Sequence, residues 1–171
     1  DKNTSSPKIG DEKTEFEKAI GETDATTRIS ALQNFLKNFP NTEQKNRVLG
    51  LIVSGRAEIA EVKLQNFETE EAVKLFKLAV KEVPQPVSDE LFSRVLMQIP
   101  SSLFFRGERK SAYEISDLIE EKIGDNAKQL IGLSAFFISV ENGLDAVRVL
   151  NKSIEKDPNS SVAYQTLGLA H

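Results

Sequence analysis

Residues 157–168 read Asp-Pro-Asn-Ser-Ser-Val-Ala-Tyr-Gln-Thr-Leu-Gly, and this stretch decides the fold. Pro158 cannot continue a helix, so it ends the apolar-periodic segment that precedes it. A new helix is predicted from Ser161, in which Tyr164 is followed three residues later by Leu167-Gly168. The aromatic and the leucine then share one helix face, and the small glycine beside them lets a neighbouring helix approach. The stretch therefore predicts two packed helices joined by a short turn.

The same spacing occurs further upstream in the chain. Ala146, Leu150 and Pro158 repeat Ala72, Phe76 and Pro84, with the same offsets of four and twelve. Ala112, followed twelve positions later by Gly124, lies between the two sets and divides the interval from Ala72 to Ala146 into two parts of similar length. Self-similarity at such a period predicts an array of stacked helical units.

Apolar residues three and four apart run through residues 11–171, and no period of two is sustained, so the sequence predicts an all-α fold. The predicted helices cover residues 16–20, 29–39, 41–66, 69–83, 88–99, 109–123, 126–141, 144–156 and 161 onward. Thr69 and Ser88 are expected to cap their helices, and Pro100 is expected to end the helix before it. A break in the long third helix is expected at Gly50 or Gly55.

These positions resemble the tetratricopeptide-repeat family, whose pattern is W-x2-L-G-x2-Y, then A-x3-F, then P, in a repeat of about 34 residues. In residues 127–160, Leu130, Leu133-Ser134, Phe137, Ala146, Leu150 and Pro158 take these positions. The resemblance implies antiparallel helix pairs stacked in a right-handed α-solenoid over residues 11–171, after a flexible tether at residues 1–10. Its best repeats are 53–86 and 127–160, with a partial one at 161–171 and degenerate ones at 93–124 and 16–40.

Composition excludes several classes of function. Twenty-two basic and 26 acidic residues are interleaved to a net charge of −4, which disfavours nucleic-acid binding. The chain has no cysteine and a single histidine, His171, so His-based triads and His or thiolate metal sites are excluded. No phosphate-binding glycine motif is present. The sequence predicts a protein that is not an enzyme, with no cofactor and no metal.

The compartment is not fixed by these features. Lack of cysteine fits both the cytoplasm and an export route. The polar, Ser- and Pro-containing segment of residues 1–10 favours an exported, bacterial protein. No apolar run approaches the length of a membrane span, so no membrane insertion is expected.

The resemblance implies a partner peptide or protein on the inner face, which the first helix of each pair lines. The partner-binding residues predicted there are Ala57, Glu61, Leu64, Arg94, Met97, Lys128, Ile131, Ala135 and Ile138. Phe104, Phe105 and Arg106 form a further candidate contact, because two adjacent aromatics cannot both face one side of a helix. Packing of both rings in the core through an irregular turn is the favoured interpretation, and a partner contact is its alternative.

Two functions remain open. The favoured hypothesis is a scaffold for protein–protein interaction, and the alternative is a helical accessory region of a larger exported enzyme. The alternative rests on Arg28–Pro40, which resembles helical segments found before thioredoxin-like domains. Because the sequence stops at Leu169-Ala170-His171, inside a new repeat, a fragment of a longer chain and self-association through the C-terminal helix are also expected.

Overall fold

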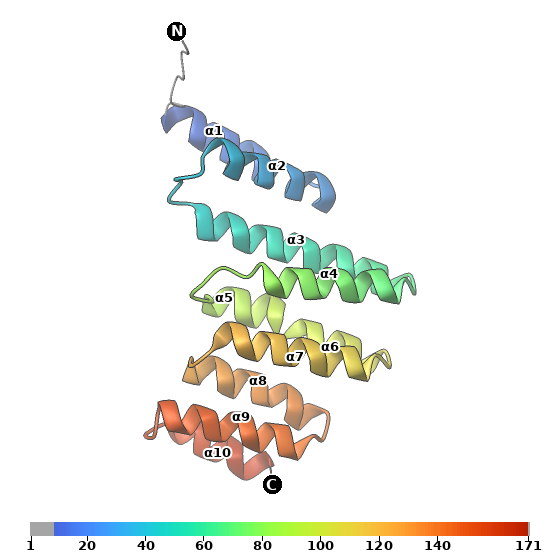
Figure 1. Cartoon of the computed structure of the whole chain (residues 1–171), viewed down its shortest axis with the longest axis vertical. Helices are drawn as coiled ribbons and strands as arrows, with labels where there is room; N and C mark the ends of the chain where they lie inside the picture. The colour runs from blue at the N-terminus through green and yellow to red at the C-terminus, as the bar shows by residue number, and fades with distance from the viewer. Residues whose placement is uncertain (1–8, 171) are drawn as a thin grey trace. The chain divides into compact units, whose positions relative to one another are not determined.

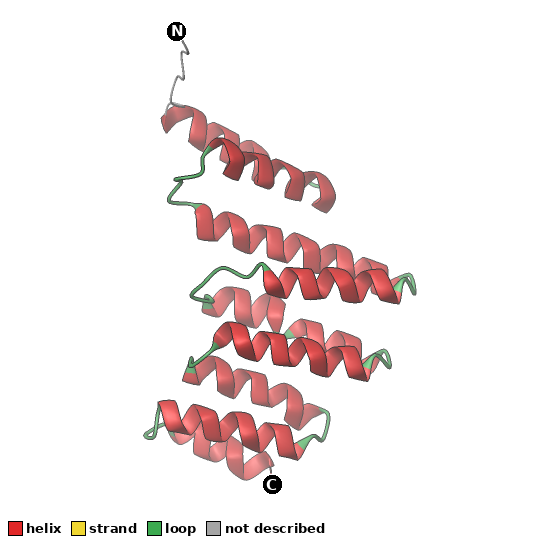
Figure 2. Cartoon of the chain, viewed as in Figure 1, coloured by secondary structure: helices red, strands yellow, loops and turns green. Residues whose placement is uncertain are grey.

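The computed structural model describes residues 9–170, and in that part of the chain the regular elements are helices, with no strand (Figure 2). The predicted all-α fold is confirmed. The helices are α1 (Ile9–Ile20), α2 (Ala25–Asn38), α3 (Lys45–Gln65), α4 (Thr69–Lys81), α5 (Asp89–Leu91), the π-helix η1 (Phe92–Leu96), α6 (Gln98–Phe105), α7 (Arg109–Ile123), α8 (Ala127–Ser139), α9 (Gly143–Lys156) and α10 (Ser161–Ala170).

The contacts divide the chain into two compact units, residues 1–84 and residues 85–171. The described part of the first unit holds α1 to α4, and that of the second holds α5 to α10 (Figure 1). In the first unit α2 packs on α1 and α3, and α3 packs on α4; in the second α6 packs on α7, and α9 packs on α8 and α10. Short connections join the helices of these packed pairs, which run antiparallel.

Three turns between paired helices close in the same way. The backbone N–H groups of Glu68, Glu108 and Asn142 donate to carbonyl oxygens five residues earlier, those of Lys63, Leu103 and Phe137, at 2.9, 3.0 and 2.9 Å. In each turn the residue before the donor has a positive φ: 64° at Phe67, 92° at Gly107 and 56° at Glu141. This left-handed residue ends the first helix of the pair and lets the chain fold back.

Equivalent backbone contacts recur at the alanines of the sequence repeat. Ala72, Ala112 and Ala146 each donate a backbone hydrogen bond to the residue four before, which is the residue that closes the turn. All three alanines are fully buried. Their small side chains allow the second helix of each pair to pack closely on its neighbours. The intervals between these alanines are therefore structural repeats as well as sequence repeats.

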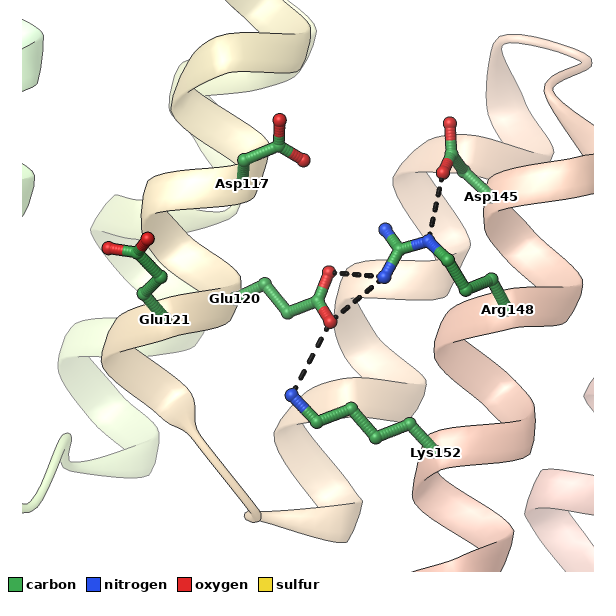
Figure 3. A pocket seen from close by; sticks show the side chains of 6 residues that line it. All are labelled: Asp117, Glu120, Glu121, Asp145, Arg148 and Lys152. Atoms are coloured by element: carbon green, nitrogen blue, oxygen red, sulfur yellow. Dashed lines mark hydrogen bonds and ion pairs between the residues drawn. The ribbon is translucent and has the colours of Figure 1, made fainter.

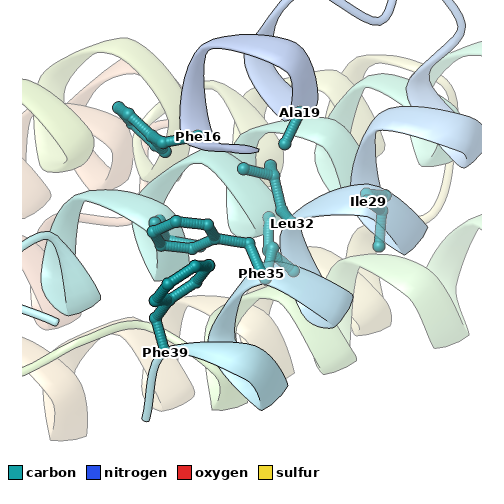
Figure 4. Close-up of a cluster of buried hydrophobic side chains, with 8 residues drawn as sticks. Phe16, Ala19, Ile29, Leu32, Phe35 and Phe39 are labelled. Atoms are coloured by element: carbon teal, nitrogen blue, oxygen red, sulfur yellow. The ribbon is translucent and has the colours of Figure 1, made fainter. Parts of the chain in front are cut away.

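The degenerate segment at residues 16–40 also forms a packed helix pair. Phe16 from α1 and Phe35 from α2 have ring centroids 5.4 Å apart, and Phe35 lies 5.0 Å from Phe39. Figure 4 shows these rings gathered in the hydrophobic cluster of the first unit. The buried residues of this cluster are Phe16, Ala19, Ile29, Leu32, Phe35, Phe39, Val48 and Ile52, of which the last two belong to α3. The α1–α2 pair therefore covers one side of α3.

Several predicted helix ends are wrong. Ile9 and Gly10 belong to α1, so they are not part of the tether, whose residues 1–8 lie outside the described part of the chain, as does His171. The third helix is continuous through Gly50 and Gly55. The cap residue of α4 is Glu68, and Thr69 is the first helical residue, so the predicted Thr69 cap is wrong. The Glu68 carboxylate pairs with Lys63 at 2.5 Å. The Ser88 cap is confirmed by its acceptance of the Leu91 N–H at 3.2 Å.

The expected stop at Pro100 is also wrong. Pro100 is the third residue of α6, in the first helical turn, where a missing N–H leaves no intrahelical bond unmade. The preceding π-helix η1 closes with a bond from the Met97 N–H to the Phe92 carbonyl oxygen at 3.0 Å. A π-turn holds one more residue than an α-turn. After this turn α6 begins at Gln98, and the chain continues as a helix past the proline.

Replacing Phe67 with glycine is expected to raise the free energy of unfolding of the first unit by about 1 kcal/mol, since a left-handed conformation costs an L-residue roughly 1–2 kcal/mol and glycine almost nothing. The Phe67 ring is 92% exposed, so its removal loses little packing. Urea denaturation measures the change. Asn66→Gly is the control, because Asn66 has a φ of −87° and gains nothing from glycine. A loss of stability in Phe67→Gly would contradict the assigned backbone geometry.

Candidate functional site

The predicted inner-face residues of the first unit differ in exposure. Ala57 and Glu61 on α3 are half-buried and retain surface. Leu64 is buried, so its prediction as a partner-binding residue is wrong. It lies near the end of α3, a helix packed against both α2 and α4, and its side chain belongs to that packing. Only Ala57 and Glu61 of this set remain candidates for contact with a partner.

In the second unit the predicted residues of α8 form a surface stripe. Lys128 and Ala135 are exposed, and Ile131 and Ile138 are half-buried. The spacing of three and four residues places all four on one helix face. The opposite face of α8 is buried, with Leu130, Leu133 and Phe137 in the core. These four side chains of α8 therefore retain surface within the second unit.

The segment containing Arg94 and Met97 packs beside α8. A Cβ at Gly132 would lie 2.6 Å from the Phe92 ring, so the small residue allows η1 to approach α8 closely. Lys128 pairs with Asp89 at 2.5 Å, and the buried Gln129 amide donates to the Val87 carbonyl oxygen at 2.9 Å and to Asp89 Oδ1 at 3.1 Å. Arg94 is exposed and pairs with Glu90 at 3.1 Å, and Met97 is half-buried.

The carboxyl group of Asp89 is held in its charged form by these contacts. The hydrogen bond from Lys128, followed by that from Gln129, lowers the pKa of Asp89 below its ordinary value. Gln129 Nε2 faces two acceptors, so the orientation of the amide is fixed by its partners. These contacts connect the start of α5 to the start of α8. The exposed surfaces of the two helices are therefore adjacent there.

Helix α10 extends the α8 stripe with Val162, which sequence reasoning missed, and with Leu169, which belongs to the C-terminal helix expected to self-associate. Val162 is 55% exposed and Leu169 is 76% exposed. They follow Lys128 and Ala135 at the same interval that separates Ala146 from Ala112, so the repeat itself could have identified them. A Cβ at Gly143, at the start of α9, would lie 2.9 Å from the Ala170 carbonyl oxygen. The end of α10 therefore lies at the end of α8, and the two helices run parallel.

The α8–α10 strip, defined as Ile131, Ala135, Ile138, Val162 and Leu169, is apolar and free of charge. No charged residue occurs in residues 129–140 or in residues 158–170. The strip therefore offers water apolar surface and no charged group of its own, which makes its exposure to solvent unfavourable. Such a surface favours the docking of an apolar side chain or helix face.

The aromatic pair at the end of α6 divides between core and surface. Phe104 is half-buried and contacts Tyr113 and Phe136, with ring centroids 6.0 and 6.1 Å away. Phe105 is 71% exposed, so the favoured prediction that both rings pack in the core is wrong. Both residues lie in regular helix, where neighbours differ by about 100° in direction, so only one can point inward. Arg106 is exposed and donates to Ser102 Oγ at 2.6 Å.

A depression of about 390 Å³ between α7 and α9 is lined by charged side chains, drawn in Figure 3. Glu120 accepts from Arg148 at 2.9 Å and from Lys152 at 3.4 Å, and Arg148 also donates to Asp145 at 3.1 Å. Partial burial, partly offset by Arg148, raises the pKa of Asp117. Both cations of the depression are paired with Glu120 or Asp145, so this network joins α7 to α9.

Within residues 9–170 no group of three or more His, Cys, Asp or Glu side chains is arranged to hold a metal ion. None of the described helices is both long and apolar enough to cross a membrane.

Comparison with known proteins found a structural neighbour. No family model matches the chain, and no curated protein matches it. A tetratricopeptide repeat protein from Parabacteroides merdae ATCC 43184 has a solved structure similar to this one, with a TM-score of 0.47 and 13% sequence identity. The match covers 94% of this chain and 59% of that protein, so this chain spans less than two thirds of its length.

Proposed function

We propose that this chain is a scaffold for protein–protein interaction and that a partner segment docks on the α8–α10 strip. The observation that carries the proposal is the exposure of large apolar side chains, Val162 and Leu169, beside the half-buried Ile131 and Ile138. Exposed large apolar side chains that lie together on a protein surface commonly mark an interaction site. Binding would remove them from water, and apolar burial contributes about 25 cal/mol per Å².

The geometry favours an elongated, largely apolar partner segment. The exposed apolar side chains of α8 and α10 lie on two parallel helices, and an amphipathic helix or extended peptide suits such a surface. Ala135 is small and exposed, so a partner can approach the α8 backbone closely there. Lys128 stands at one end of the stripe, where it would set the direction of an acidic partner terminus.

Site-specific photocrosslinking tests the proposal. With p-benzoylphenylalanine in place of Ala135 or of Leu169, irradiation in the source cells is expected to give a discrete crosslinked species with one partner protein. The same probe in place of Asn151, which is exposed on α9, is the matched control and should give none. Ala135→Glu in a chain carrying the Leu169 probe should abolish the species, because a buried charge without a partner opposes binding.

The distribution of crosslinks decides the outcome. Equal labelling from Ala135 and Asn151 positions would refute a dedicated binding strip. A crosslink from the Leu169 position to a second copy of the chain would assign α10 to self-association. Tyr164 on α10 is exposed, whereas its equivalent on α8, Leu130, is buried beneath α9, so self-association through this helix is a real competitor for the same residues.

A further inference from the structure

The turn between α6 and α7 presents an aromatic ring among positive charges. Phe105 is exposed, and Arg106, Arg109 and Lys110 follow it within five residues. These four residues are called the Phe105 surface below. Arg109 and Lys110 occupy the first turn of α7, where the helix dipole disfavours cations, and no acidic residue accompanies them in that turn. Residues 105–110 hold three cations and one carboxylate, Glu108 at the start of α7, so the local charge is opposite in sign to the net charge of the chain.

The ring is mounted on a packed support. Phe105 contacts Phe104 edge to face, with centroids 5.7 Å apart and planes at 82°. Phe104 is held in turn by Tyr113 and Phe136. The guanidinium carbon of Arg109 lies 5.2 Å from the centroid of the Phe104 ring. An exposed aromatic on a preorganised base loses little conformational entropy when it binds, which is a property of interface anchors.

The cations of the Phe105 surface are positioned by their neighbours. Arg109 rests on the Phe104 ring, and the ammonium group of Lys110 lies 3.9 Å from Glu114, at the long end of an ion pair. Arg106 donates to Ser102 Oγ at 2.6 Å, which orients its guanidinium. A carboxylate placed here would meet positive charge on several sides.

The other helix-pair turns provide a contrast. Phe67 and Leu144 are also exposed, at 92% and 89%, but their neighbours are acidic. Glu68, Glu70 and Glu71 follow Phe67, and Glu141 and Asp145 flank Leu144. An acidic ligand would be repelled at both turns and attracted at the Phe105 surface. The charge pattern therefore favours binding of an acidic ligand at the α6–α7 turn over the other two turns.

We infer that the Phe105 surface binds an acidic peptide segment of a partner protein, in which a large apolar side chain packs on Phe105 and flanking carboxylates pair with Arg106, Arg109 and Lys110. The inference rests on the proposed function in that the partner is a protein, but it concerns a surface separate from the α8–α10 strip. Carboxylate–guanidinium pairs supply direction, and the aromatic contact supplies most of the binding free energy.

Selection from a phage library of short random peptides on the immobilised chain tests the inference. The enriched peptides are expected to combine several Asp or Glu residues with a Phe, Leu or Trp. Their affinity should fall by about tenfold or more in Phe105→Ser and in Lys110→Glu. Lys45→Glu is the matched charge control, because Lys45 is exposed on α3 and the variant changes the net charge equally. Leu144→Ser controls for loss of an exposed apolar side chain and should keep full binding.

Other outcomes overturn the inference. It fails if no peptide is enriched, if the enriched peptides lack carboxylates, or if they bind Phe105→Ser as well as the unaltered chain. Peptides lost in Ala135→Glu but kept in Phe105→Ser would support the α8–α10 strip and refute this second surface. Sedimentation with phosphatidylserine vesicles that depends on Phe105, with no peptide enriched, would assign the surface to an anionic membrane instead. Melting temperatures within a degree or two of the unaltered chain establish that each variant is folded.

Discussion

Replacing Phe137 with alanine is expected to lower the free energy of unfolding of the second unit by about 3–5 kcal/mol. Phe137 is buried, and its ring stacks on Tyr113 at 6.4 Å and contacts Phe136 at 5.3 Å. The phenyl group joins α8 to α7, so its removal leaves a cavity between two helices that backbone relaxation cannot easily fill. The loss is a large share of the stability of a small domain.

Hydrogen exchange resolved by mass spectrometry measures this effect separately for each unit. Protection should fall in α7, α8 and α9, while α2 and α3 keep theirs. Phe105→Ala is the matched control, since it removes the same phenyl group from an exposed position and should change stability by less than about 0.5 kcal/mol. Equal destabilisation by the two variants would contradict the division of the aromatic cluster into core and surface.

Ala146→Leu is expected to destabilise the second unit by about 1–3 kcal/mol, because the added atoms enter a packed contact between helices. Ala146 is fully buried on α9, a helix that packs on both α8 and α10. Thermal unfolding followed by far-ultraviolet circular dichroism, which reports helix content, measures the change as a fall in melting temperature of several degrees.

The control for this variant is Asn151→Leu. Asn151 is exposed on the same helix. Its neighbour Lys152 is less suitable as a control, because Lys152 bonds to Glu120 at 3.4 Å and its replacement would also remove that interaction. Asn151→Leu should leave the melting temperature nearly unchanged. Equal melting temperatures for Ala146→Leu and Asn151→Leu would contradict the structural equivalence of Ala146 with Ala72 and Ala112.

The repeat spacing was predictable because it depends on residue size and on helix-ending chemistry. Small residues are required where helices meet, and Ala72, Ala112 and Ala146 mark those places in the sequence. The turns that the spacing implies, at Glu68, Glu108 and Asn142, are present. A periodic pattern carries this information because each unit solves the same packing problem.

Exposure of individual side chains was less predictable, because it depends on what packs over them. Leu64 and Ile138 are repeat equivalents, separated by the same interval as Ala72 and Ala146, yet Leu64 is buried and Ile138 is half-buried. The pattern places both on the first helix of a pair but does not say how closely each neighbour covers them. For Phe104 and Phe105, helix periodicity required one ring to face outward without indicating which.

The irregular path through Phe92–Leu96 was not predictable, since no local signal distinguishes a π-turn from an α-turn there. The sequence predicts a helix end at Pro100 because a proline inside a helix removes a hydrogen bond. In the structure it falls in a first turn, where no such bond is due. The π-turn changes the helical phase between Ser88 and Pro100, so the position of Pro100 in its helix does not follow from its distance to Ser88.

The π-helix η1 also determines how this part of the chain responds to a change in its length. A π-turn holds one residue more than an α-turn, so deletion of an exposed residue such as Ser93 would convert η1 to α-helix and leave the residues after it facing as before. The same deletion within α8 would rotate every later side chain by about 100° and turn the charge-free stripe toward the core. Among the described helices of the second unit, η1 is thus a place where one residue can be lost without changing which later residues face the solvent.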